Sequence, residues 1–169
     1  MRLCGFTFVT VVALDQLTKL CVRRFIALHE ARVVLTPCLD ICHVENPGAA
    51  WGMFAGHRWP LIAVSLATGL VFIAARRTLL AGGRIGHFLT GLLFGGLVGN
   101  VIDRLLYGTV TDFIHVHWRA VWDFPAFNVA DSALCIAAGL FVLRSFLESR
   151  RTRGAANGDS GHAATESSP

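Results

Sequence analysis

Four long apolar segments alternate with more polar connections along the chain. They span about residues 3–26, 59–76, 85–106 and 128–147. The stretch from Trp59 to Ala75, for example, contains 17 residues and no charged side chain. A helix needs about 20 residues to cross a hydrocarbon core of about 30 Å. With their flanking residues all four segments are long enough, so the pattern predicts four transmembrane helices in one domain, residues 1–148.

The two longer connections carry different patterns. Residues 27–58 contain alternating, β-branched stretches at 32–36 and 39–44, which predict a small extracytoplasmic β-sheet on the membrane surface. Residues 107–127 are rich in aromatic side chains, which is typical of a surface loop or short helix at the membrane interface. The predicted fold class is therefore an all-α membrane protein with these two surface elements.

The C-terminal segment 149–169 lacks hydrophobic periodicity and consists mainly of Gly, Ala, Ser, Thr and charged residues. Such a segment has too little apolar surface to fold on its own. We expect it to be a disordered cytoplasmic tail.

Charged side chains make up only 15% of the chain, while 54% of its residues are hydrophobic. A soluble domain carries about 25% charged residues, so the composition excludes a soluble globule and a disordered chain. The five cysteines are scattered and odd in number, which argues against a disulfide scaffold and favours packing roles.

The net charge of +4 reflects basic residues that flank the apolar segments, as membrane topology requires. With four spans, both termini and the short connection between the second and third segments lie on one side. That side carries more arginines than the other, which places both termini in the cytoplasm. No basic run interleaved with aromatics indicates a nucleic-acid partner.

Ionisable residues within membrane spans are costly and mark candidate functional positions. Asp15 and Lys19 are four residues apart and can form an ion pair on one helical face. Asn100, Asp103 and Arg104 lie within about one helical turn, where Arg104 can be an anchor at the membrane interface with Asp103 as its partner. From spacing alone, each of these pairs also has a purely structural explanation.

Asp112 and Asp131 lie at the two ends of the same outward connection, so both are expected near the outer membrane boundary. Asn128 followed by Asp131 is also a variant of the capping box, and capping alone would explain that pair. Two adjacent carboxylates cannot both ionise easily, so one retains a proton. The charged one can deprotonate water and the neutral one can polarise a carbonyl, which indicates hydrolysis without a metal or a nucleophilic side chain.

Two other chemistries remain open at this point. His115 and His117 would share one face of a strand and could bind a metal together with Asp112, as in a metal-dependent membrane hydrolase. Alternatively, Asp15, Asp103 and Asp131 could form the ion path of a small membrane transporter. The grouping of Asp112 and Asp131 at one side of the membrane disfavours such a path.

Three glycines recur every four residues on one face of the third apolar segment, at positions 91, 95 and 99. Small residues at this spacing allow another helix to approach closely. We therefore interpret them as packing residues and assign them no chemistry.

Four ordered motifs resemble the lipoprotein signal peptidase family, also called signal peptidase II or prolipoprotein signal peptidase. They are Asp15-Gln16-Leu17-Thr18-Lys19, the segment 46–52 that begins Asn46-Pro47-Gly48, the segment 95–114, and Trp122 followed by residues 125–132.

The resemblance implies a four-helix aspartic endopeptidase of the bacterial inner membrane, with both termini in the cytoplasm and its active site near the outer face. Such an enzyme removes the signal peptide of prolipoproteins just before the diacylglyceryl-modified lipobox cysteine. The implied partners are this lipidated precursor, membrane lipid and globomycin-type inhibitors. No metal or cofactor is implied, and we expect a monomer.

The resemblance also implies a role for each matching residue. Asp112 and Asp131 correspond to the catalytic pair. The residues implied in substrate binding are Asn46, Gly48, Asn100, Arg104, Asn128 and Ala130. The residues implied as polar supports of the site are Asp15, Lys19 and Asp103.

Overall fold

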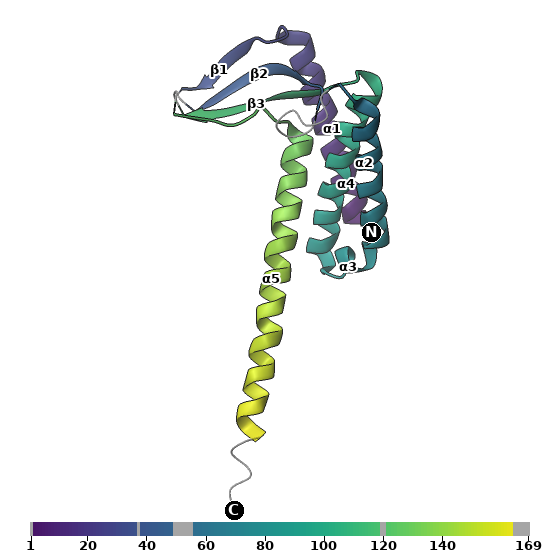
Figure 1. Ribbon diagram of the computed structural model, residues 1–169, viewed down its shortest axis with the longest axis vertical. Coiled ribbons are helices and arrows are strands. Elements are labelled where there is room, and N and C mark those ends of the chain that lie inside the picture. Colours follow the sequence, from purple (N-terminus) through teal and green to yellow (C-terminus); the bar gives the residue numbers. More distant parts are fainter. Residues whose placement is uncertain (1, 37, 49–55, 119–120, 164–169) are drawn as a thin grey trace, which may run out of the picture. The chain divides into compact units, whose positions relative to one another are not determined.

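The computed structural model describes residues 2–36, 38–48, 56–118 and 121–163 (Figure 1). The chain divides into two units, residues 1–137 and 138–169. The candidate site and all the strands belong to the first unit.

The helices follow the predicted apolar segments. They are α1 (Arg2–Phe25), α2 (Arg58–Ala74), α3 (Arg76–Leu80), α4 (Gly83–Leu106) and α5 (Val129–Ala163). Three stretches of the described residues are long and apolar enough to cross a membrane, namely α1, α4 and the part of α5 from Val129 to Arg150. α2 is apolar but has only 17 residues, and rises about 26 Å. The described residues thus contain three candidate membrane spans, and the predicted fourth span at α2 is not confirmed.

The polarity of the fold is that of a membrane protein. Large apolar side chains such as Phe6 on α1 and Leu70 on α2 are exposed, whereas Asp15, Lys19 and Asp103 are completely buried. In water this arrangement would expose large apolar patches. In a bilayer it places the apolar faces in lipid and the charges inside the protein.

α1 packs mainly against α4, and glycines make the close approach possible. A Cβ atom added at Gly95 would lie 2.7 Å from the Cβ of Val11, and one at Gly91 would lie 2.6 Å from the Cβ of Thr7. Both distances are shorter than any ordinary contact between these atoms. The predicted packing role of the glycines on α4 is therefore confirmed, with α1 as the neighbouring helix.

Four strands form one antiparallel sheet, in which they lie in the order β1-β2-β3-β4. Their bounds are β1 (Ala31–Leu35), β2 (Leu39–Asn46), β3 (Val110–Trp118) and β4 (Trp122–Asp123). The sheet lies at one end of α1, α2 and α4, and α3 lies at the other end (Figure 1). The predicted small sheet is therefore confirmed as β1 and β2, and it is larger than expected. Its extracytoplasmic location stays a prediction.

The prediction of a surface loop or short helix within residues 107–127 is wrong over Val110–Trp118, which form strand β3. This segment alternates β-branched and polar side chains, and it pairs with β2 so that Asp112 is opposite Val44. Gly108, with φ of +83°, provides the turn from α4 into β3 in a conformation that favours glycine. The pairing joins segments about 70 residues apart, so the local sequence did not reveal it.

α5 continues as a helix to Ala163, whereas the composition predicted a disordered tail over 149–169. Once a helix has started in an apolar span, each further residue adds a hydrogen bond without a new nucleation cost. Residues 164–169 lie outside the described residues, so the disorder of the tail as a whole stays a prediction.

Candidate active site

A cavity of about 410 Å³ lies where β2, β3, α4 and the beginning of α5 meet. Apolar residues supply much of its wall, and polar side chains gather on α4, β3 and α5. The lining residues are Asn46, Gly48, Asn100, Arg104, Val110, Asp112, Phe124, Pro125, Ala126, Phe127, Asp131, Ser132 and Cys135. The two aspartates predicted to form a pair thus share one cavity.

Asp112 is the third residue of β3 and is only 3% exposed. Its Oδ2 accepts a hydrogen bond from Asn46 Nδ2 at 3.0 Å, and its Oδ1 accepts one from Asn128 Nδ2 at 2.7 Å. Both carboxylate oxygens are therefore held by amide donors from neighbouring elements.

Asp131 lies in the first turn of α5. Its Oδ2 accepts the backbone N–H of Asn128 at 3.3 Å, and Asn128 Oδ1 accepts the backbone N–H of Asp131 at 2.9 Å. This reciprocal pair is a capping box, as the sequence predicted. Asn100 Nδ2 donates a further hydrogen bond to Asp131 Oδ1 at 2.7 Å. The cap thus fixes a carboxylate that also lines the cavity.

Burial, assisted by the negative charge of Asp131, raises the pKa of Asp112 to about 7. Hydrogen bonds from Asn46 and Asn128 oppose this rise. The ordinary value for an aspartate is about 3.9. Near neutral pH Asp112 therefore exchanges a proton easily, as an acid or base of a hydrolytic pair must.

The orientations of both asparagine side chains follow from their partners. Asn100 Oδ1 accepts hydrogen bonds from Lys19 Nζ at 3.1 Å and from Asn128 Nδ2 at 3.2 Å. Because an amide oxygen only accepts, the nitrogen of Asn100 is left to face Asp131. The side chain of Asn100 thus connects Lys19 to Asp131, because it accepts a hydrogen bond from the ammonium group and donates one to the carboxylate.

Buried charges hold the backbone beside each cavity aspartate. Lys19 Nζ lies 2.8 Å from Asp15 Oδ2 and 3.1 Å from Asp103 Oδ2. Asp103 accepts the backbone N–H of Thr111 at 3.1 Å, and Asp15 accepts that of Ala130 at 2.9 Å. Thr111 and Ala130 directly precede Asp112 and Asp131, so the ion network positions both.

Arg104 lies at the cavity wall with its guanidinium bound to main-chain oxygens. Its Nη2 donates to Gly48 O at 3.2 Å and its Nη1 to Asn100 O at 3.5 Å. Among the residues that the structure describes, its Nε is buried without a hydrogen-bond partner. Arg104 therefore keeps a donor that is not used within the described chain.

Four of the six residues predicted to bind substrate line the cavity, namely Asn46, Gly48, Asn100 and Arg104. The other two, Asn128 and Ala130, are completely buried and support the site from within the protein. Residues 49–52 of the second motif lie outside the described residues.

Sequence reasoning missed two contributions to the site. Gln16 Nε2 donates to Asp15 Oδ2 at 3.1 Å and to Asp103 Oδ1 at 3.2 Å, which closes the ion network. Its place within the motif of residues 15–19 was a signal, but that motif did not indicate which atoms Gln16 binds. Cys135 lines the cavity because it follows Asp131 by four residues, and helical periodicity alone could have identified it.

The structure does not group Asp112 with His115 and His117. Asp112 is bound by Asn46 and Asn128 in the cavity, whereas the described residues that surround the two histidines include Asp40. A metal-dependent hydrolase built on Asp112, His115 and His117 therefore does not fit this geometry.

Comparisons with known proteins agree on one family. The sequence model of the family described as signal peptidase (SPase) II matches residues 7–147. The chain is 40% identical over 157 residues to the lipoprotein signal peptidase of Syntrophotalea carbinolica, covering 83% of this chain and 89% of that protein. It is 36% identical over 145 residues to the lipoprotein signal peptidase of Bacillus subtilis, covering 85% and 92%.

Solved structures point the same way. A bacterial membrane enzyme determined by the in meso method at 2.3 Å resolution superposes with a TM-score of 0.80 at 27% identity, covering 88% of this chain and 90% of that one. A second bacterial membrane enzyme, determined at 1.9 Å, gives a TM-score of 0.75 at 29% identity, covering 85% and 92%.

Proposed function

The chain belongs to the signal peptidase II family, which removes signal peptides from prolipoproteins, and on this premise we propose that it is an aspartic endopeptidase with Asp112 and Asp131 as its catalytic pair. The observation that carries the proposal is that both carboxylates line one cavity and are bridged by Asn128. The scissile bond is the one before the lipid-modified cysteine of the precursor.

The two aspartates divide the work of hydrolysis between them. The ionised carboxylate removes a proton from the attacking water, while the protonated one donates a hydrogen bond to the scissile carbonyl. The C–N bond of the tetrahedral intermediate then breaks as a carboxyl group returns a proton to the leaving amine. A pKa of about 7 for Asp112 suits a pair that holds one proton at neutral pH, and the pair titrates as a unit.

The cavity wall suits a lipidated peptide. Val110, Phe124 and Phe127 supply apolar surface for the acyl chains or apolar side chains near the scissile bond. Arg104 and Asn46 supply polar groups for the peptide backbone. Asn128 and Ala130 lie behind the cavity wall and support it from the protein interior. A globomycin-type inhibitor would compete with substrate for the same space, and the monomer contains the whole proposed site.

The proposed topology places all four long helices across the membrane with both termini in the cytoplasm. α2 serves as the fourth span, because α3 and flanking residues lengthen it. Arg76 and Arg77 lie in α3, between α2 and α4, and Arg84 lies in the first turn of α4. This group of basic residues favours the cytoplasm for this end of the helices. The cavity is then near the outer face. A reporter active only in the cytoplasm, fused after residue 169, should be active; its inactivity would contradict this topology.

The transporter alternative gains no support from the geometry. Asp15 and Asp103 are completely buried and closed into an ion network with Lys19. Carboxylates of an ion path need access to water along the membrane depth.

The proposed specificity is tested with the purified protein in liposomes. A lipid-modified prolipoprotein and its unmodified form are supplied, and products are identified by mass spectrometry. We expect cleavage of the lipidated form only, directly before the modified cysteine. Equal cleavage of both forms, or cleavage at another bond, would contradict the proposal.

A further inference from the structure

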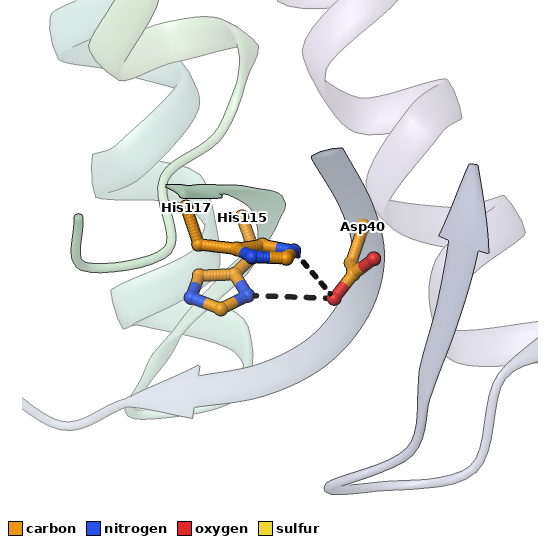
Figure 2. Close-up of side chains that lie close together, drawn as sticks. All are labelled: Asp40, His115 and His117. Carbon is orange, nitrogen blue, oxygen red and sulfur yellow. Dashed lines mark ion pairs between the residues drawn. The ribbon is translucent and has the colours of Figure 1, made fainter. Parts of the chain in front are cut away.

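A second group of polar side chains lies on the sheet, outside the cavity. Asp40 on β2 and His115 and His117 on β3 each offer one ligand atom, and these atoms lie within 4.8 Å of one another. Figure 2 shows both imidazole rings directed at the same carboxylate oxygen. We propose that these three residues form a binding site for a divalent transition metal, for which zinc fits the donor set best.

Strand register brings the three residues together. His115 and His117 are two residues apart on β3, so they share one face of the sheet. Asp40 is directly opposite His115 in the pairing of β2 with β3, and His117 is its diagonal neighbour on that face. The same alternation directs Asp112 to the other face of β3, so the metal site and the proposed catalytic pair are separate.

The spacing of the ligand atoms suits a tetrahedral ion. Asp40 Oδ2 lies 3.1 Å from His117 Nε2 and 3.9 Å from His115 Nδ1. Ligands bound to zinc at about 2.0–2.2 Å are separated by about 3.3–3.6 Å in a tetrahedral site, which lies between these two distances. The ligand atoms of the two histidines lie within 4.8 Å of each other and their rings are stacked. Binding the ion therefore also requires both rings to turn towards one point beside Asp40.

The second nitrogen of His115 has the partner that metal-binding histidines require. Its Nε2 contacts Asp123 Oδ1 on β4 at 2.5 Å, which directs Nδ1 towards Asp40. A carboxylate that binds the outer nitrogen fixes the tautomer of a ligating imidazole and increases its basicity. Asp123 is therefore the positioning residue of the proposed site.

Two atoms of the group are left unsatisfied by the protein. Within the part of the chain that the structure describes, Asp40 Oδ1 and His117 Nε2 are buried without a hydrogen-bond partner. His117 Nε2 is close to Asp40 Oδ2 but is not aligned for a hydrogen bond. Such groups are rare in folded proteins. An ion bound to His117 Nε2 and Asp40 Oδ2 satisfies the nitrogen, and bidentate binding by Asp40 would satisfy Oδ1 as well.

The donor set also selects the class of metal. Two imidazoles and one carboxylate suit zinc and similar transition metals, whereas Ca²⁺ and Mg²⁺ prefer oxygen ligands only. Three protein ligands leave a fourth position for water. Because Asp40 belongs to β2 and both histidines to β3, the ion would join these strands next to the register shift between Ile41 and Val44.

The test measures metal binding by the full chain, purified in detergent with a histidine-free tag and stripped with EDTA. Zinc is titrated in competition with a chromophoric chelator. We expect one equivalent of zinc, weakened by about 10-fold or more in His117→Gln and Asp40→Asn and by about 10–100-fold in Asp123→Asn. His87→Gln, which changes a histidine on α4, is the matched control and should bind zinc normally.

Circular dichroism and gel filtration confirm that each variant is folded before its affinity is compared. The proposal would be overturned if the wild-type protein binds no zinc, or if His117→Gln leaves zinc binding unchanged. The three residues would then be a carboxylate in contact with two imidazole rings. Mg²⁺ should not displace zinc, and displacement would also contradict the donor argument. Because the readout is binding, its failure leaves the peptidase proposal untouched.

Discussion

The carboxylate of Asp15 accepts the backbone N–H of Ala130 at 2.9 Å, and thereby ties α1 to the residue that precedes Asp131. Asp103 holds the N–H before Asp112 in the same way. Lys19 lies between the two acids. One buried cation on α1 thus controls the position of both cavity aspartates, so the ion network is part of the proposed active-site architecture.

Replacement of Lys19 by Met should strongly destabilise the protein. Asp15 would be left buried without Lys19. Of the cations in the described residues, Asp103 would keep only Arg23, whose Nη1 lies 3.7 Å from Asp103 Oδ1. Removing one partner of a buried pair costs about 3–5 kcal/mol. Thermal unfolding in detergent measures the loss. Arg32→Gln, which breaks a largely exposed pair with Glu30, is the control and should cost little, because solvent screens exposed ion pairs. Equal effects of both substitutions would contradict a structural role for the network.

Gly95→Ala should weaken the packing of α1 on α4. The added methyl group would lie 2.7 Å from Val11 Cβ, and relieving such overpacking costs about 1–3 kcal/mol. Gly5→Ala is the matched control because no atom lies within 4 Å of a Cβ placed there. The unfolding temperature should fall for Gly95→Ala and stay equal or rise for Gly5→Ala. Helix propensity alone favours alanine at both positions, so an equal change in both variants, in either direction, would contradict a packing contact at Gly95.

Activity should show a bell-shaped dependence on pH and should fall as the pH rises above about 7. Above the pKa of Asp112, which is about 7, both carboxylates are ionised and neither can donate to the scissile carbonyl. At low pH both are protonated and neither can deprotonate water. The measurement is kcat/KM for a lipidated precursor between about pH 5 and 9. A rate that continues to rise through pH 8 would be inconsistent with a shared proton.

Asp112→Asn should make stability less dependent on pH. The folded-state pKa of Asp112 is raised above the value of about 3.9 for an unfolded chain. The folded state therefore binds more protons between these values, and wild-type stability falls as the pH rises from about 4 to about 7. The neutral amide that the variant carries at this position does not titrate, so this loss of stability is absent. Each 1 kcal/mol of stability corresponds to about 2–4 °C in unfolding temperature.

The unfolding temperatures of wild type and Asp112→Asn are compared at about pH 5 and about pH 8, on either side of the raised pKa. The difference between the two pH values should be smaller in the variant. Glu45→Gln, at an exposed carboxylate on β2, should behave like wild type. An unchanged pH dependence in Asp112→Asn would show that the carboxylate is not buried as described.

The sequence predicted those features that depend on local pattern. Asp112 and Asp131 flank one connection, and this alone indicated that they lie close together. The capping box at Asn128 and Asp131 followed from their spacing. The pairing of Asp40 with His115 did not follow, because strand register across 75 positions leaves no local signal. The bridge formed by Gln16 was missed for a similar reason, since it depends on how α1 packs against α4.

The most direct measurement of the central claim compares cleavage of lipidated precursor by wild type, Asp112→Asn, Asp131→Asn, Glu45→Gln and His117→Gln, each with and without EDTA. We expect either aspartate substitution to reduce the rate by about 10²–10⁴-fold, while Glu45→Gln and EDTA leave it unchanged. Full activity of Asp112→Asn or Asp131→Asn would contradict the catalytic pair. Loss of activity in EDTA, in wild type and also in His117→Gln, which lacks the proposed zinc site, would contradict metal-free hydrolysis.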